Sequence, residues 1–187
     1  MKNGLVSALG VVALIMIVVA TQPADAQTIS AGPYYATPSW DQKLQCDTQA
    51  TCPRFIVLSN WNNAAVLDRE TGLVWEQSPG TTRQTWPNAQ PLCNNKVVGN
   101  RKGWRLPTIQ ELASLLDPSV PGLALPAGHP FSNINTLQYW SATTIASNTS
   151  FAWIVIFGSG DVTSDNKDPN FKDFVWCVRG GSGVDPQ

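Results

Sequence analysis

The stretch from Gly103 to Asp117, GWRLPTIQELASLLD, constrains the fold more than any other part of the sequence. Thr108 followed three residues later by Glu111 is the pattern of a capping box, which fixes where a helix begins. Apolar residues then recur at helical spacing and predict one buried face. The members of this face are Ile109, Leu112, Ala113 and Leu116.

The residues that lead into this helix, Trp104 to Pro107, could belong to a functional site or only to the fold. Pro107 restricts Leu106 to extended backbone, so Trp104 and Leu106 can enter the core while Arg105 points elsewhere. We interpret the segment as a structural motif. In this interpretation Arg105, like Arg179, pairs with a carboxylate such as Glu111 or Glu76 and with free carbonyls at loop ends.

Short strands precede this motif and longer strands follow it. Before it, residues 67–77 read as strand, turn and strand with the turn at 70–72, and residues 85–96 fit a short helix with Trp86, Ala89 and Cys93 on one face. Residues 151–157, FAWIVIF, are apolar on both faces and predict a central buried strand. The other predicted strands are 55–58, 64–68, 139–144 and 174–180. This order, with strands at both ends and two helices between them, predicts an α+β fold.

Two connections carry no apolar period, residues 118–138 and residues 158–173. The first is rich in Pro, Gly and Asn, and the second reads as a polar turn region. Long connections inside a domain are usually functional, so we place candidate ligand-binding residues there. They are Asn133, Asn135, Lys167, Asp168, Asn170 and Lys172.

The ends of the chain are expected to lie outside the domain. Lys2, the apolar run 5–20 and the pattern Ala24-Asp25-Ala26 predict that residues 1–26 are a cleaved signal peptide, so the protein is exported to the periplasm, the cell surface or the medium. Residues 27–54 read as an irregular arm, 55–181 as one domain and 182–187 as a tail. The net charge of −1 favours no nucleic-acid partner, and no other segment is apolar enough for membrane insertion.

Four cysteines, Cys46, Cys52, Cys93 and Cys177, lie in the exported part, where disulfides can form. Three pairings are open from sequence alone. A bridge between Cys46 and Cys52 would close a short loop, and one between Cys93 and Cys177 would close a loop of about 84 residues, worth roughly 4.6 kcal/mol. No C-x-x-C spacing occurs and the lone His129 is remote, so no metal site is predicted.

Other residue types offer weaker functional signals. We expect Trp75, Trp104, Trp140, Trp153 and Trp176 to fill the core, whereas Trp40, Trp61 and Trp86 are less anchored. Six Asp and Asn residues in the second connection could supply oxygen ligands to calcium, but they are also common turn residues, so we predict no cofactor. They are Asp161, Asp165, Asn166, Asp168, Asn170 and Asp173. No residue stands at a telling spacing from His129, so no catalytic residue is predicted.

Several of these motifs occur together, in order, in one family. LDRETGLVWEQ, the helix ending at Cys93, GWRLPTIQELASLLD, YWSAT, FAWIVIFGSGDV and WCVRG resemble the Lcl C-terminal domain family over about residues 55–181. The RLPT segment also resembles the formylglycine-generating enzyme group. The resemblance implies a C-type lectin-like fold, which has two helices, a small central antiparallel sheet and long irregular loops. It also implies a disulfide from the first helix to the last strand.

The resemblance also implies a function. The family takes its name from the end domain of a collagen-like adhesin that binds sulfated glycans, so we expect a non-catalytic, exported module that binds a glycan or a cell-surface protein. This chain has no Gly-X-Y segment and little net charge, so neither a trimer nor a sulfated ligand is part of the prediction. The alternatives are a structural or assembly protein of the bacterial envelope and an oxidase related to the formylglycine generators.

Overall fold

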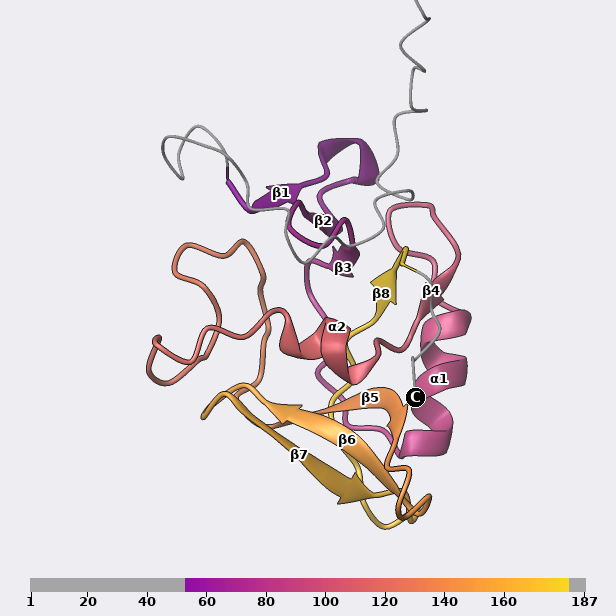
Figure 1. The fold of residues 1–187 in the computed structure, drawn as a ribbon. Coiled ribbons are helices and arrows are strands. Elements are labelled where there is room, and N and C mark those ends of the chain that lie inside the picture. Colours follow the sequence, from indigo (N-terminus) through magenta and orange to yellow (C-terminus); the bar gives the residue numbers. More distant parts are fainter. Residues whose placement is uncertain (1–52, 182–187) are drawn as a thin grey trace, which may run out of the picture. The chain divides into compact units, whose positions relative to one another are not determined.

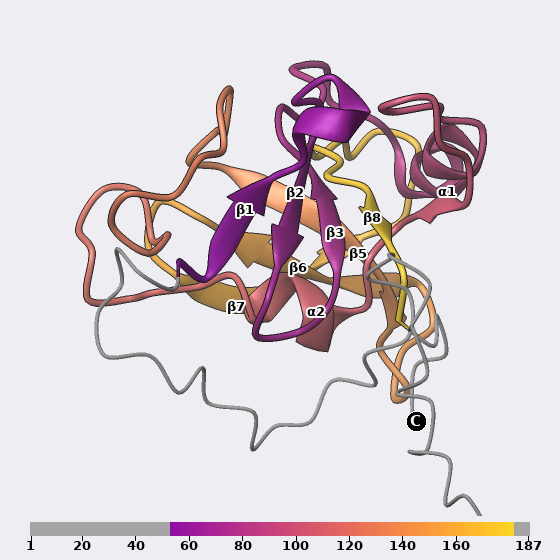
Figure 2. The same cartoon turned by 90° about the horizontal axis from the view of Figure 1, so that it is seen from above.

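The computed structural model describes residues 53–181, and Figures 1 and 2 show them from two directions. The predicted signal peptide, most of the predicted arm with Cys46 and Cys52, and the tail 182–187 lie outside the described residues. Within residues 53–181, no helix is long and apolar enough to cross a bilayer.

The first half of the described chain builds most of a five-stranded sheet. Its strands are β1 (Phe55–Val57), β2 (Ala65–Asp68), β3 (Val74–Glu76), β4 (Trp104–Arg105) and β8 (Val178–Arg179), with the short 3-10 helix η2 (Ser59–Trp61) between β1 and β2. The order across the sheet is β1-β2-β3-β8-β4, and all neighbours are antiparallel. The last strand of the chain therefore lies between two earlier ones.

The predicted turn between β2 and β3 is fixed by Asp68. Its carboxylate accepts hydrogen bonds from the Glu70 amide and the Thr71 hydroxyl, each at 3.0 Å. Gly72 follows with a φ of 70°, a left-handed conformation that glycine adopts without a steric cost. These local bonds explain why LDRETGLVW forms a hairpin.

A second, three-stranded sheet contains β5 (Gln138–Thr144), β6 (Phe151–Ile156) and β7 (Asp161–Asn166). β6 lies between β5 and β7, as its apolar sequence predicts. The prediction that residues 158–173 form only a turn region is wrong, because residues 161–166 pair with β6 along their whole length. β7 was missed because an edge strand has one solvated side and does not need an apolar sequence.

The predicted single sheet is thus two sheets, and the strand predicted over residues 174–180 pairs as a strand only at Val178–Arg179. The preceding residues still bridge the sheets, since the Phe174 carbonyl accepts from the Trp140 amide at 3.0 Å. α+β is confirmed as the fold class, with two α-helices among the described residues.

Helix α1 (Trp86–Asn94) buries Ala89 and Cys93 on the predicted face and accommodates Pro87 in its first turn. Helix α2 (Ile109–Ala113) is shorter than predicted, and Ser114 is its C-cap residue. Its capping box is formed as predicted, and α2 packs against β5 and β6. Figure 1 shows α2 between the two sheets and α1 at the side of β4.

Alternation along the strands produces two hydrophobic clusters. Val66 and Trp75 of the first sheet join Tyr139 and Val155 of the second in one cluster. Their neighbours in sequence point to the other face, where the second cluster contains Ala65, Val74, Trp104, Trp140, Ala152 and Ile154. Both sheets therefore contribute to both clusters.

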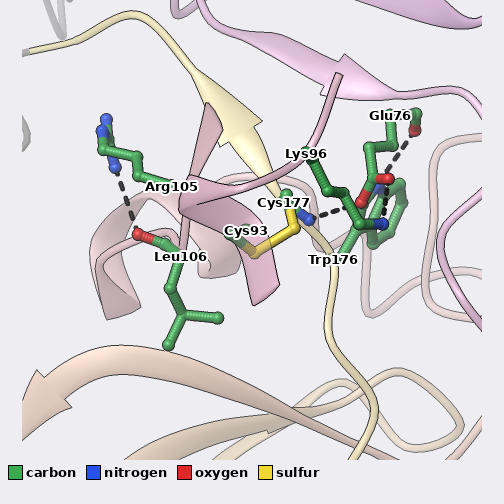
Figure 3. Close-up of a disulfide and its surroundings, with 7 residues drawn as sticks. All are labelled: Glu76, Cys93, Lys96, Arg105, Leu106, Trp176 and Cys177. Atoms are coloured by element: carbon green, nitrogen blue, oxygen red, sulfur yellow. Dashed lines mark hydrogen bonds and ion pairs between the residues drawn. A yellow bond between two sulfur atoms is a disulfide. The ribbon is translucent and has the colours of Figure 1, made fainter. Parts of the chain in front are cut away.

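The disulfide joins Cys93 of α1 to Cys177, with an S–S distance of 2.04 Å and both cysteines buried (Figure 3). This is the helix-to-last-strand bridge that the family resemblance implies. Glu76 lies beside it, where its carboxylate accepts from Lys96 and from the Cys177 amide (Figure 3). The buried acid thus links β3, the end of α1 and the chain that enters β8.

Candidate functional site

The segment Trp104 to Glu111 has the structural role that the sequence predicts. Trp104 and Leu106 are buried, and Arg105 forms two hydrogen bonds to the Glu111 carboxylate at 2.7 and 2.6 Å. Arg105 also donates to the Gly180 carbonyl at 2.6 Å. Thr108 accepts from the Glu111 amide, and the Glu111 carboxylate accepts from the Thr108 amide. Arg105 is therefore committed to holding α2 against the end of β8.

Candidate residues of the long loop hold that loop in place. The Asn133 side chain donates to the Ser78 hydroxyl at 2.8 Å, and the Asn135 side chain accepts from the Leu137 amide at 3.0 Å. The Tyr139 hydroxyl accepts from the Asn135 amide at 2.7 Å. Burial raises the pKa of Tyr139 to about 12, so this hydroxyl stays protonated near neutral pH.

The other four candidates lie at the opposite end of the three-stranded sheet. Gln138, just after the long loop, pairs with Ile156, whereas Phe151 pairs with Asn166, just before Lys167. Five residues of β6 separate these positions, a distance on the order of 17 Å. In Figure 1, β7 runs from the long loop at the left toward the right. The six candidate residues consequently do not form a single site.

Lys167 packs over Trp86 at the start of α1. Its Nζ lies 3.9 Å from the ring centroid and donates to the Thr144 hydroxyl at 2.6 Å and the Thr149 carbonyl at 3.0 Å. Trp86 is half-buried and donates to the Ser141 carbonyl at 2.8 Å. Partial burial lowers the pKa of Lys167. This lysine therefore fixes the end of β7 to α1, and two of the three donors of its ammonium group are used within the fold.

Residues 166–172 form consecutive turns, and we call this segment the tip loop. The Asn166 side chain accepts from the Asp168 amide at 2.8 Å, and the Asp168 side chain accepts from the Asn170 amide at 2.9 Å. The Asn170 side chain also donates to Asp168 at 2.6 Å. Beyond these turns, Phe171 and Lys172 are exposed.

The residues considered as calcium ligands also lie at opposite ends of β7. Asp161 bonds to Ser159 at the far end of β7, while Asn166 and Asp168 serve the turns. Within the part of the chain that the structure describes, no group of three or more His, Cys, Asp or Glu side chains could hold a metal ion.

Two of these acids flank the tip loop, Asp165 before it and Asp173 after it. Asp165 is the last residue but one of β7, and Asp173 is buried. Asp173 is only 3% exposed, and burial together with Asp165 raises its pKa to about 7, against the lowering effect of Arg83. Arg83 itself lies over the Phe174 ring, at 5.3 Å from the centroid.

A basic group also surrounds Trp61, which the structure buries. The guanidinium carbons of Arg101 and Arg179 lie 5.5 and 5.4 Å from its ring centroid. Arg179 donates to the Lys102 carbonyl at 2.8 Å, as the predicted bonding to loop-end carbonyls requires. These cations therefore cover a core tryptophan at the edge of the five-stranded sheet.

Comparison with models of known families shows which family the chain belongs to. The family model described as the Lcl C-terminal domain matches residues 64–179, which run from just before β2 to the end of β8. The chain belongs to the Lcl C-terminal domain family. A search of the curated proteins found no match.

For this Lcl C-terminal domain, the sequence analysis selected candidate ligand-binding residues in the tip loop but missed two features of this region. It did not select Phe171, the aromatic among the exposed large hydrophobic side chains of residues 53–181. It also placed Asp173 among the possible calcium ligands without predicting that burial and Asp165 raise its pKa. The sequence also contained a signal for β7. Val162 and Thr163 follow the turn GSG, and β-branched residues after a buried strand favour a hairpin.

Proposed function

We propose that this Lcl C-terminal domain is an exported, non-catalytic binding module that engages a carbohydrate or another cell-surface ligand. Family membership and the signal-like residues 1–26 support the proposal. We also propose that its fold is a variant of the C-type lectin-like fold. The combination of two helices, antiparallel sheets and a disulfide from α1 to the last strand supports that assignment.

The observation that carries the binding proposal is the exposure of Phe171 in the tip loop. Its side chain is 45% exposed and is flanked by the exposed side chains of Asn170 and Lys172. An aromatic face next to an amide and an ammonium group offers a stacking surface with donors for hydroxyl or acidic groups. The sequence placed ligand binding in this segment through Lys167, Asp168, Asn170 and Lys172.

The tip loop is also held in one conformation before a ligand arrives. The Asn166 and Asp168 turns are followed by a bond from the Phe171 amide to the Asp168 carbonyl at 2.9 Å. Lys167 fastens the start of the loop to Thr144 and Trp86. Because ordering a loop on binding costs free energy, a preorganised loop binds more tightly.

The disulfide supports a non-catalytic role. Formylglycine-generating enzymes use a pair of late cysteines, and the late cysteine of this chain, Cys177, is bonded to Cys93. A thiol count on the native protein tests this point, because the absence of free thiols would exclude a paired-cysteine mechanism. A free thiol at Cys177 would favour the oxidase alternative.

A glycan array and a pull-down with the exported protein test the binding proposal. We expect Phe171→Ala, Asn170→Ala and Lys172→Ala each to weaken binding, with Phe171→Ala losing about tenfold or more. Leu137→Ala is the matched control, because Leu137 is 40% exposed and precedes β5 at the other end of the sheet. If every detected ligand binds the three tip-loop variants as tightly as the wild type, the placement is wrong.

The envelope-assembly alternative has one observation in its favour. β7 is an edge strand, and Val162 on it is 43% exposed, so another chain could pair with this edge. Crosslinking and size measurement in the periplasm distinguish the two functions. A stable protein partner that is lost in Val162→Lys, without glycan affinity, favours assembly.

A further inference from the structure

The outer edge of β7 differs from the other sheet edges of the domain. In the five-stranded sheet, the edge strands β1 and β4 are only three and two residues long. β5 has a register irregularity between Trp140 and Thr144, and its outer side is partly covered, since the Trp140 amide donates to the Phe174 carbonyl. β7 instead pairs with β6 in one constant register over all six of its residues, and no strand among residues 53–181 pairs with its outer side (Figure 1). Such a long, regular edge is a surface to which another strand can add.

The backbone groups that this edge offers follow from the pairing of β6 with β7. The Lys167 amide donates to the Ser150 carbonyl at 2.9 Å and continues this pairing by one residue. Hydrogen-bonded positions alternate along an antiparallel strand, so the odd-numbered residues of β7 bond to β6 and the even-numbered residues direct their amide and carbonyl groups outward. The outward residues are Val162, Ser164 and Asn166. The Asn166 amide bonds to the Asp165 side chain at 2.7 Å, which leaves the other two as the outward donors.

A second copy of this chain fits the edge in one register. Two β7 strands can pair antiparallel only if outward residues face outward residues, because the other backbone groups already bond to β6. With Ser164 opposite the partner's Ser164, Asp165 faces the partner's Thr163. Asp161 then faces the partner's Lys167. A shift by two residues in one direction sets Asp161 against the partner's Asp165, and in the other direction it sets Asp165 against the partner's Asp165. Like charges directly opposite are destabilising, so the two aspartates exclude the neighbouring registers.

The side chains of this register are able to accept a partner strand. Asp161 and Thr163 are exposed. The Asp161 carboxylate accepts from the Ser159 hydroxyl at 2.6 Å, and a carboxylate has further acceptor sites. Lys167 is held over Trp86, so it contributes a nearby positive charge and not a direct contact. The partner strand would also cover apolar surface, because Val162 is 43% exposed.

We propose that β7 pairs with the β7 of a second copy about a two-fold axis at Ser164, so that two three-stranded sheets become one continuous sheet. Because both copies use the same strand, the contact closes at two subunits. An edge of this length buries less surface than a stable interface needs. The dimer is therefore weak, and its population depends on the protein concentration.

The dimer would present two tip loops. Each loop follows Asn166, which lies opposite the partner's Val162, so the starts of the two loops are about 13 Å apart along the joined sheet. Two linked binding sites hold a repetitive immobilised ligand more tightly than one site does. This gain in binding rests on the proposed function, whereas the pairing of the strands does not.

Sedimentation of the whole exported protein over a series of concentrations tests the pairing. We expect the wild type to change from monomer to dimer and no further. Ser164→Pro removes the central outward amide, and proline is tolerated on an edge strand where the amide faces solvent. This variant should keep its fold, checked by near-ultraviolet circular dichroism, and should stay monomeric at concentrations at which the wild type is dimeric. A wild type that is monomeric throughout, a larger assembly, or a Ser164→Pro variant that dimerises like the wild type overturns the proposal.

Cysteine substitutions test the register and decide the question if Ser164→Pro does not fold. Ser164→Cys places its thiol opposite the same residue of the partner, so a mild oxidant should link the two chains. Thr163→Cys is the matched control, because it lies one residue away and faces the partner's Asp165. It should form linked dimers more slowly by about tenfold or more. Equal rates at the two positions, or a faster reaction in Thr163→Cys, contradict the register.

A glycan array printed at high and at low density keeps the pairing and the proposed function apart. Ser164→Pro should lose about tenfold or more in apparent affinity at high density and little at low density. Phe171→Ala should lose binding at both densities and still dimerise like the wild type. If Phe171→Ala binds normally while the wild type is dimeric, the proposed binding surface fails and the dimer stands. If Phe171→Ala loses binding while the wild type is monomeric at every concentration, the dimer fails and the binding surface stands.

Discussion

The two sheets of the domain treat their buried carboxylates differently. On the five-stranded side, Asp68 forms hydrogen bonds of 3.0 and 2.9 Å with Arg54, and Glu76 is paired with Lys96. On the three-stranded side, burial and the acid Asp165 raise the pKa of Asp173, and Lys167 packs on an aromatic ring.

This difference separates the side of the domain that stabilises the fold from the side where we expect function. A buried acid with a cation and backbone donors is satisfied and links distant parts of the chain. A buried acid whose neighbouring charges include a second acid is costly in its ionised form. We therefore assign the five-stranded side mainly to the stability of the fold, and we expect responses to pH and ligand on the three-stranded side.

The largest expected effect comes from removing the disulfide next to the five-stranded sheet. The double substitution Cys93→Ser and Cys177→Ser should lower the free energy of unfolding by roughly 4–5 kcal/mol, because it opens a loop of 84 residues. Chemical denaturation measures the change. The pair Cys46→Ser and Cys52→Ser is the matched control. If these cysteines form the short-loop bridge that the sequence allows, the pair should cost about 2 kcal/mol. Equal losses in the two pairs would contradict the prediction.

A smaller effect is expected when a satisfied acid loses its cation. Arg54→Met leaves the Asp68 carboxylate, whose side chain is 0% exposed, without its guanidinium and should cost about 3 kcal/mol. Lys102→Met replaces an exposed cation near the same sheet and should change stability by less than about 0.5 kcal/mol. Adding Asp68→Asn to Arg54→Met should recover part of the loss, and failure to do so would show that packing dominates.

The dependence of stability on pH should distinguish the two sides next. The pKa of Asp173 is raised from its usual acidic value to about 7, so the folded state holds a proton that the unfolded state has released. The stabilisation is complete below about pH 4 and is lost as the pH rises to about 7. We expect Asp173→Asn to remove the part of this decline that Asp173 causes, so that stability falls less between about pH 4 and about pH 7, as measured by denaturation at a series of pH values.

Other groups contribute to the same curve and require that variant as the reference. Burial also raises the pKa of Glu76, which adds a decline of the same sign, and burial lowers the pKa of His129, which acts in the opposite direction. Both remain in Asp173→Asn, so the difference between the two curves isolates Asp173. Parallel curves would show that Asp173 does not hold the proton.

The smallest expected effect concerns the cap of α2. Thr108→Ala removes the hydroxyl that accepts from the Glu111 amide and should cost about 1 kcal/mol in thermal or chemical unfolding. Thr108→Ser retains the acceptor and should cost less. A loss of several kcal/mol in Thr108→Ala would mean that the cap also holds the contact of Arg105 with Glu111.

The features that sequence predicted are those with local or strongly apolar signals. The capping box, the Asp68 turn and the central strand β6 follow from residues close together in the chain. The pairing of Arg105 with Glu111 follows because the two side chains flank a single helix start. The bond between Cys93 and Cys177 is nonlocal and was implied by the family resemblance, not by spacing.

The features that sequence missed depend on partners far along the chain. β7 has a polar sequence, and its strand conformation depends on the neighbouring β6. Trp61 is buried because η2 places it beside Trp104, with ring centroids 6.4 Å apart, which no local pattern indicates. The raised pKa of Asp173 depends on its burial in the folded domain, which no local pattern indicates. Exposure of Phe171 is likewise a property of the folded loop.

The position of β8 also sets a limit on when this domain can fold. β8 lies between β3 and β4, so the five-stranded sheet is interrupted until Val178 and Arg179 arrive. During synthesis from the N-terminus, β3 and β4 appear before β8 and cannot yet pair with it, because pairings between distant residues form only when both are present. Assembly of the first sheet is therefore completed by nearly the last residues of the matched family region, after the disulfide partner Cys177 has also emerged.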